Sequence, residues 1–156
     1  MAHLKVLVFG ENVEEQLAPF GIDNDATGVG EYEWDWWEIG GRFAGGFTLR
    51  PDADPQDHET PKPQMLRRIF DKRAGLKRTS TRTTNRARKR AITINRDTTA
   101  EIYAVVQHGQ WHSLDRPDGW ASDPEDVSWE QWAPQVNRLI SEAPEDEWLT
   151  IVDCHL

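Results

Sequence analysis

Three of the eight tryptophans in this chain lie within four positions, at Trp34, Trp36 and Trp37, and they are interleaved with carboxylates. An indole ring buries a large area, so tryptophans at this density need a packing or a recognition role. In an extended segment, Trp34 and Trp36 would share one face, and Asp35 and Trp37 would share the other. The sequence Gly-Gly-Arg at residues 40–42 then predicts a bend in the chain.

The composition indicates an ordered protein with a modest core. Hydrophobic residues make up 37% of the 156 positions, a low share for a globular domain, and the tryptophans offset part of that shortfall. No run of about 18 apolar residues occurs, so we expect no membrane span. The first apolar run, at residues 4–9, is too short for a signal peptide. Cys154 is the single cysteine, which excludes an internal disulfide and favours a cytoplasmic location.

Short apolar runs separated by turn residues predict an α+β fold. Strands are expected at residues 4–9, 43–49, 102–107, 110–114 and 148–154, and helices at 12–17, at 64–74, and from 128 (or one turn later, near Pro134) to 140. We expect a small mixed or antiparallel sheet with two or three helices on one face. The whole chain, 1–156, is predicted to form a single domain that carries a basic insertion at 62–96.

That insertion is the strongest electrostatic signal in the sequence. Residues 62–96 contain 13 Lys or Arg and one acid, Asp71, whereas the net charge of the chain is −9. Residues 76–90 read as a solvated helix or a disordered arm. Basic side chains mixed with Ser, Thr and Asn suit phosphate contacts. The candidate nucleic-acid-binding residues are Arg78, Arg82, Arg86, Arg88, Lys89 and Arg90. The alternative is that the segment folds against the acidic remainder and neutralises it.

The tryptophan-rich block is a candidate ligand site. Two glycines let backbone N–H groups approach a ligand, an arginine can bind phosphate or carboxylate with two hydrogen bonds, and indole faces can stack on a ring. The candidate ligand-binding residues are Trp34, Asp35, Trp36, Trp37, Gly40, Gly41 and Arg42. The alternative is a bend that packs the tryptophans, with Arg42 paired to Asp35 or Glu38.

The last strand offers candidate catalytic residues. Asp153 and His155 would share one face, where an Asp–His pair can orient an imidazole for base chemistry or ligate a metal, while Cys154 would be buried on the other face. A structural Asp–His pair is the alternative. His108 and His112 are four residues apart, but a hairpin there removes the helical geometry of metal ligands, with or without His155. We therefore assign no metal site and no cofactor.

Four segments of the chain form a distinctive set of motifs. They are Val-Glu-Glu-Gln-Leu-Ala-Pro-Phe at 13–20, Trp-Asp-Trp-Trp-Glu-Ile-Gly-Gly-Arg at 34–42, Tyr-Ala-Val-Val at 103–106 with Trp111, and Leu-Thr-Ile-Val-Asp-Cys-His at 149–155. Together they resemble a family of small proteins encoded by tailed bacteriophages, many of which infect actinobacteria. The chain departs from the family at Phe43, where tryptophan is more usual, and at 118–121. The resemblance implies expression inside a bacterial host and implies no activity.

These observations predict a phage accessory protein that binds a host macromolecule or a nucleic acid in the host cytoplasm, without catalysis. The alternative is an enzyme or a binder of an anionic, nucleotide-like small ligand, which requires the tryptophan block and the last strand to converge. A third reading is an acidic decoy for a nucleic-acid-binding protein, with the acids at 115–130 and 142–147 on one face.

Overall fold

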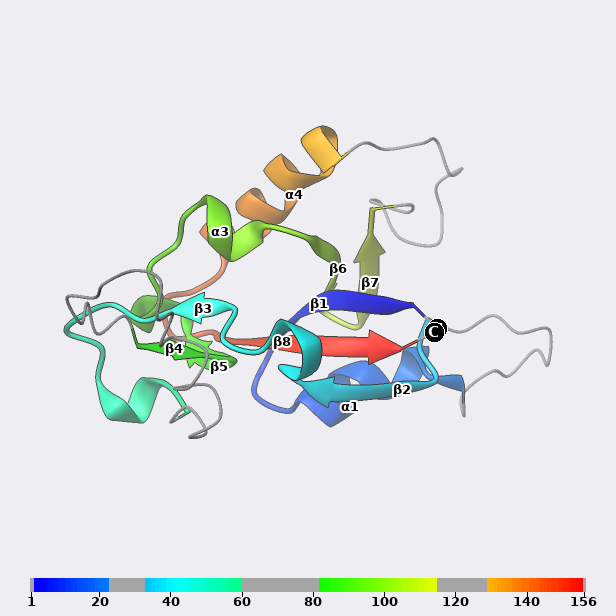
Figure 1. Ribbon diagram of the computed structural model, residues 1–156, viewed down its shortest axis with the longest axis horizontal. Coiled ribbons are helices and arrows are strands. Elements are labelled where there is room, and N and C mark those ends of the chain that lie inside the picture. The colour runs from blue at the N-terminus through cyan, green and yellow to red at the C-terminus, as the bar shows by residue number, and fades with distance from the viewer. Residues whose placement is uncertain (1, 23–32, 60–81, 115–128, 156) are drawn as a thin grey trace, which may run out of the picture.

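The computed structural model describes residues 2–22, 33–59, 82–114 and 129–155, and each of these four ranges contributes at least one strand to a six-stranded mixed sheet. The strands of this sheet are β1 (His3–Phe9), β2 (Trp36–Ile39), β5 (Arg86–Arg88), β6 (Ile102–Gln107), β7 (Gln110–Ser113) and β8 (Trp148–His155). Their order is β2-β8-β1-β6-β7 (Figure 1). Strand β5 pairs with the first residues of β8, and β2 pairs with its last residues.

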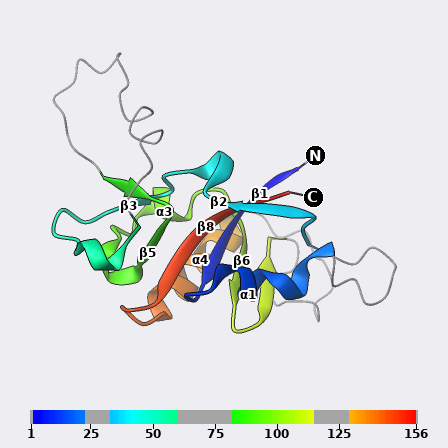
Figure 2. The same ribbon diagram turned by 90° about the horizontal axis from the view of Figure 1, so that it is seen from below.

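Strands β1 and β8 form the centre of the sheet. They are antiparallel, and their register places His3 opposite His155 and Lys5 opposite Asp153. On its other side β1 is parallel to β6, which turns through a hairpin into β7. The start of β1 and the end of β8 therefore meet at one end of the sheet, where Figure 2 marks both ends of the chain.

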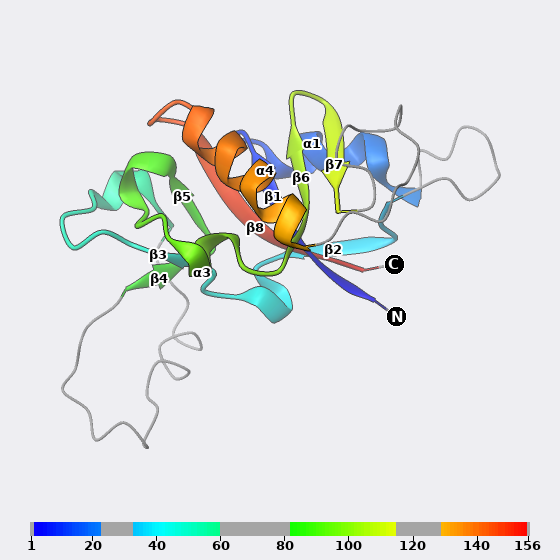
Figure 3. The same ribbon diagram turned by 90° about the horizontal axis from the view of Figure 1, so that it is seen from above.

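A helix covers each face of this sheet. On one face, Val13 and Leu17 of α1 (Val13–Leu17) pack with Val6 and Val8. On the other face, α4 (Trp129–Glu142) contributes Trp132, Val136 and Ile140 to a second cluster that contains Leu7, Phe9, Leu149 and Ile151. Figure 3 shows α4 lying across the central strands on this second face. The strict alternation of β1 and β8 between two cores explains why both strands are almost continuously apolar.

The α4 face changes character along the two central strands. Leu7 and Phe9 of β1 belong to the α4 cluster, and two-residue alternation places His3 and Lys5 on the same face. On β8, the same alternation extends the face of Leu149 and Ile151 to Asp153 and His155. The face is thus apolar at one end and polar at the end where the termini of β1 and β8 meet.

Short elements complete the fold around the sheet. They are η1 (Ala18–Phe20), η3 (Gly41–Phe43), β3 (Phe47–Thr48), η4 (Pro55–Asp57), β4 (Thr83–Thr84), η6 (Lys89–Ala91) and α3 (Arg96–Thr99). Strands β3 and β4 pair with each other in a separate two-stranded sheet. Asn95 begins α3 with a capping box, since its side chain accepts from the backbone of Thr98 and the Thr98 hydroxyl accepts from the backbone of Asn95.

The predicted α+β class with a mixed sheet is confirmed, as are the first strand, the 102–114 hairpin, the last strand and the Asn12-capped helix. The helices divide between the two faces instead of sharing one, because both faces of the central strands are apolar. The expected strand at 43–49 shrinks to Phe47–Thr48. Pro134 lies inside α4 instead of in its first turn. The predicted helix at 64–74 lies outside the described residues.

The basic segment differs from its prediction where it is described. Residues 82–90 form β4, β5 and the start of η6, not a solvated helix or a disordered arm. Thr84, Ala87 and Ala91 are buried, and Ala87 and Ala91 belong to the α4 cluster. Small buried residues between the cations therefore anchor this part of the segment to the core.

Helices in the described part of the chain lack either the length or the apolar character that a bilayer span needs.

Candidate functional site

The tryptophan block and the last strand converge at the polar end of the sheet. Strand β2 is antiparallel to β8 in a register that places Trp36 opposite His155 and Glu38 opposite Asp153. Figure 1 shows β2 and β8 side by side. The small-ligand alternative requires the tryptophan block and the last strand to lie together, and the structure meets this condition.

Asp153 is the centre of the site. Its side chain is 1% exposed, and its Oδ2 accepts a hydrogen bond of 2.9 Å from the backbone N–H of Arg42. His3 Nδ1 lies 3.0 Å from both carboxylate oxygens, so His3 donates to Asp153. His155 Nε2 lies 3.7 Å from Asp153 Oδ2, and the His155 ring lies 4.1 Å from the His3 ring between centroids. The expected Asp153–His155 pair is therefore part of a three-residue cluster.

The two glycines of the block permit this arrangement. Gly40 and Gly41 have φ values of +74° and +49°, in the left-handed region that favours glycine. A Cβ on Gly41 would lie 2.6 Å from Asp153 Cβ, and a Cβ on Gly40 would lie 2.5 Å from Asn85 Nδ2. The backbone at Gly41 can approach Asp153 only because it carries no side chain. The backbone N–H groups at this bend make hydrogen bonds within the protein: Gly40 donates to Ile151 O, and Arg42 donates to Asp153.

The tryptophans separate into a packed pair and an exposed one. Trp34 and Trp37 both pack against the α1 cluster, and Trp34 Nε1 donates to Leu17 O. Trp36 is 49% exposed, and its ring meets His155 edge-on at 4.3 Å. The prediction that Trp34 and Trp36 share a face is wrong, because a bend at Asp35 precedes β2 and breaks the alternation.

Arg42 lies at the rim of a recess of about 520 Å³ on the polar end of the sheet. The recess is lined by His3, Leu4, Lys5, Arg42, Phe43, Glu101, Tyr103 and Trp129. Arg42 is exposed, and its guanidinium has no carboxylate partner among the residues that the structure describes, so the expected pairing with Asp35 or Glu38 is not seen.

Lys5 forms the buried wall of this recess. Its side chain donates to Ala100 O at 2.8 Å, and burial lowers the pKa of the Lys5 ammonium while the nearby Glu101 carboxylate opposes that shift. Glu101 has a φ of +61°, an uncommon conformation for a residue with a Cβ. The recess therefore combines cationic, imidazole and aromatic groups with one carboxylate at its edge.

Cys154 points away from this site, as expected. It is fully buried in the α1 cluster beside Val152, and burial raises the pKa of its thiol, with the Asp153 carboxylate adding to the shift. A buried thiol with a raised pKa is not a nucleophile at neutral pH.

The described cations of the basic segment contact the body of the protein. Arg90 donates twice to Asp57, at 2.9 and 2.8 Å, and this hydrogen bonding holds the pKa of Asp57 below its usual value. Arg88 lies 3.5 Å from the same carboxylate, and Arg86 lies 3.3 Å from Glu59. The guanidinium groups of Arg86 and Arg88 also lie over the Trp148 ring, 4.6 and 4.9 Å from its centroid.

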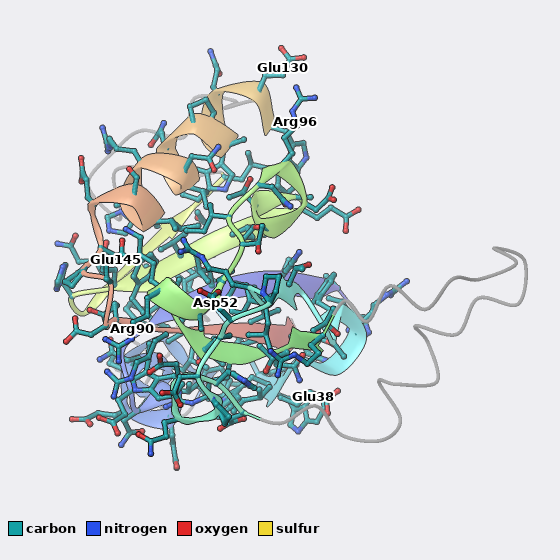
Figure 4. The ribbon with its side chains drawn as sticks, turned by 90° about the vertical axis from the view of Figure 1, so that its left-hand side faces the viewer. Glu38, Asp52, Arg90, Arg96, Glu130 and Glu145 are labelled. Carbon is teal, nitrogen blue, oxygen red and sulfur yellow. The ribbon has the colours of Figure 1, made fainter. Side chains whose placement is uncertain are left out.

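Lys89 is the most deeply buried of these cations, at 7% exposure. Its Nζ donates to Ser141 O and Ala143 O at the end of α4 and lies 3.5 Å from Glu145. Figure 4 shows Arg90 and Glu145 on one side of the molecule, where the Arg90 backbone also donates to Glu145 O. The contacts of residues Arg86 to Arg90 therefore support the alternative in which the basic segment neutralises the acidic body. Arg82 is exposed, and Arg78 lies outside the described residues.

The remaining histidine hypothesis is not supported. His108 and Gly109 form the two-residue turn of the β6–β7 hairpin, with φ values of 53° and 72°, and His112 lies on β7 at the far edge of the sheet from β2. Within the described ranges, the group of potential metal ligands that comes together is His3, Asp153 and His155, whose ligand atoms all lie within 4.8 Å of one another.

Sequence reasoning missed His3. The sequence does indicate where His3 lies. His3 and Lys5 extend the face of Leu7 and Phe9 with polar side chains. Asp153 and His155 extend the face of Leu149 and Ile151 in the same way on the neighbouring strand. Which strand pairs with β8, and in which register, is set by long-range packing that the sequence pattern does not encode. Half of the acids on which the acidic-decoy reading depends, those at 115–128, lie outside the described residues, so that reading stays a prediction.

No protein-family model matches this chain, and neither the curated proteins nor the solved structures include one similar to it. The resemblance to tailed-phage proteins therefore stays a prediction.

Substituting Gly41 by alanine tests the close approach to Asp153. Gly109→Ala is the matched control, because Gly109 also has a positive φ but a Cβ there meets nothing within 4 Å. Each substitution carries a left-handed backbone cost of about 1–2 kcal/mol. We expect Gly41→Ala to lower the free energy of unfolding in urea by about 1–3 kcal/mol more than the control does. Equal losses for the two variants would show that the η3 loop does not rest on β8.

Lys89→Met tests whether the basic segment is structural. Methionine keeps the aliphatic stem but leaves two carbonyls at the end of α4 without their charged donor, so we expect a loss of about 1–3 kcal/mol in urea unfolding. Arg82→Met is the control, because Arg82 is exposed and its contact with Pro51 O is long, at 3.4 Å. We expect the control to change stability by less than about 0.5 kcal/mol. A Lys89→Met protein as stable as the control would contradict the buried contacts.

Cys154 provides a test of the α1 core that needs no substitution. As the single cysteine, it gives an unambiguous signal with a chromogenic disulfide reagent. We expect the native protein at pH 8 to react at least about 100-fold more slowly than the same protein in denaturant, because the thiol is buried and its pKa is raised. Similar rates in both states would be incompatible with the packing of β8 against α1.

Proposed function

We propose that this protein binds a small anionic ligand in the recess beside the His3–Asp153–His155 cluster. The observation that carries the proposal is the placement of Arg42. Its backbone is fixed on the buried carboxylate of Asp153, while its side chain is exposed at the rim of the recess without a carboxylate partner among the described residues. A guanidinium held in this way suits a carboxylate or phosphate group.

The other walls of the recess fit a ligand that carries a ring. Phe43, Tyr103 and Trp129 line it, and Trp129 is 47% exposed. Aromatic faces next to a guanidinium are the combination that stacks on a base while binding its phosphate. The ligand class that these groups favour is therefore a nucleotide-like anion.

The surroundings of Asp153 exclude one catalytic role, that of a general base. Asp153 is sealed from solvent and already accepts hydrogen bonds from Arg42 and His3. A carboxylate in that state orients its neighbours and is not accessible as a general base. If the resemblance to tailed-phage proteins holds, the ligand would be met inside an infected bacterial host.

Binding to a host macromolecule or nucleic acid stays a prediction with less support. Arg86, Arg88, Lys89 and Arg90 contact Asp57, Glu59, Glu145 or backbone carbonyls of the body, so a phosphate backbone would have to compete with these partners. Neutralising them together would also remove stabilising contacts, and lost nucleic-acid binding in such a variant could not be separated from lost folding.

Arg42→Met tests the proposal directly. We expect calorimetric titration with AMP, GMP and inorganic pyrophosphate at low salt to show binding to at least one of them. Methionine should weaken that affinity at least about tenfold, since a hydrogen bond to a charged group contributes about 1.5–3 kcal/mol. Arg138→Met is the charge-matched control, because Arg138 is an exposed residue of α4 that does not line the recess.

Two results would contradict this proposal. One is the absence of binding to all three probes at millimolar concentration by the folded protein. The other is an equal effect of the Arg42 and Arg138 substitutions, which would indicate attraction by net charge instead of a defined site.

A further inference from the structure

We propose that His3, Asp153 and His155 bind a divalent transition-metal ion. The inference goes beyond the proposed function and does not depend on it, because it rests on three side chains beneath the recess and not on the ligand. Two of them come from β8 and one from the opposing end of β1, so the pairing of the two central strands assembles the set.

The spacing of the ligand atoms suits one ion. His3 Nδ1 lies 3.0 Å from Asp153 Oδ1 and from Oδ2, and His155 Nε2 lies 3.7 Å from Oδ2. Bonds of about 2.1 Å to a central ion place neighbouring ligand atoms roughly 3.0–3.4 Å apart in octahedral or tetrahedral geometry. The contacts of His3 with Asp153 already meet that spacing, and all three ligand atoms lie within 4.8 Å of one another, so His155 has to move closer when an ion binds.

The buried negative charge of Asp153 favours the binding of a cation. Asp153 is 1% exposed, and a buried carboxylate is unfavourable unless it is paired or coordinates a metal. Lys5 stands opposite Asp153 in the register, but its ammonium donates to Ala100 O. Within the described residues, the groups that contact the Asp153 carboxylate are thus two imidazoles and one backbone amide. A divalent ion between the imidazoles and the carboxylate would replace the Nδ1 proton that His3 donates to Asp153 and would itself balance the carboxylate charge.

The surroundings of the cluster hold the ligands in place. The Arg42 amide orients the Asp153 carboxylate through Oδ2, and the Gly41 backbone packs against its Cβ. The His155 ring is confined between the rings of His3 and Trp36, at 4.1 and 4.3 Å. Partners that fix the orientation of metal ligands in this way raise metal affinity.

The donor set determines the class of ion. Two imidazole nitrogens and one carboxylate suit Zn²⁺, Fe²⁺, Co²⁺ or Mn²⁺, whereas Mg²⁺ and Ca²⁺ prefer oxygen ligands throughout. Three protein ligands leave at least one coordination position open. His3 also lines the recess to which Arg42 contributes, so the metal cluster adjoins the proposed anion site.

The test is a titration of the tag-free full chain, freed of metal with a chelator, with Co²⁺ and Zn²⁺ in the absence of any anionic ligand. We expect one equivalent of Co²⁺ to bind and to give visible d–d absorption, and Zn²⁺ to displace it. Mg²⁺ should not compete at millimolar concentration. His3→Asn and His155→Asn should each weaken Co²⁺ binding at least about tenfold. His108→Asn is the matched control, because His108 is exposed on the hairpin turn and asparagine tolerates its positive φ.

Circular dichroism establishes that each variant is folded. If His155→Asn does not fold, His3→Asn decides the matter, because His3 is more exposed, with 28% of its side chain accessible. Absence of the Co²⁺ absorption, equal binding of Mg²⁺, or an equal effect of the control substitution would overturn the metal site. Anion binding that persists in chelator while Co²⁺ fails to bind would remove this inference alone. Metal binding without binding of any anion would remove the proposed function alone.

Discussion

The buried carboxylate of Asp153 is the interaction around which one end of this protein is organised. It accepts from the backbone of Arg42 in the η3 loop and from His3 on β1, and it belongs to β8. Three segments far apart in the sequence are thus tied to one side chain that is itself sealed from water. Because a buried charge without partners costs several kcal/mol, removing any one of these contacts is more harmful than the strength of a single hydrogen bond suggests.

The location of this carboxylate follows from how the central strands are used. β1 and β8 lie between two apolar layers, so nearly every side chain along them is committed to one core or the other. Toward the end where β1 starts and β8 stops, the same face carries His3, Lys5, Asp153 and His155, and Trp129 at the start of α4 lines the recess there. Asp153 is tolerated there because the Arg42 amide and His3 hydrogen-bond its carboxylate, whereas His3 stays partly exposed and lines the recess.

Local sequence patterns predicted several of the elements but not their assembly. The apolar run after His3, the His108–Gly109 turn and the cap at Asn12 each depend on neighbouring residues, and each forms where it was predicted. The pairing of Trp36 with His155 joins segments more than 100 residues apart, and its register is decided by which side chains fill the two cores. For the same reason, the Asp153–His155 half of the cluster was visible in the sequence and the contribution of His3 was not.

The uneven distribution of charge along the chain illustrates the same limit. A basic segment in an acidic protein suggests a separate partner, yet its cations from Arg86 to Arg90 pair with Asp57, Glu59 and Glu145. Small buried residues such as Ala87 force β5 into the sheet beside β8, and this places Arg86 and Arg88 over Trp148, next to the acids of the body. Charge that is segregated in sequence is thereby mixed in space. Arg42 has no such carboxylate partner among the residues that the structure describes. An exposed guanidinium whose backbone is anchored to a buried carboxylate is a better indication of a binding surface than a larger number of cations that already have partners.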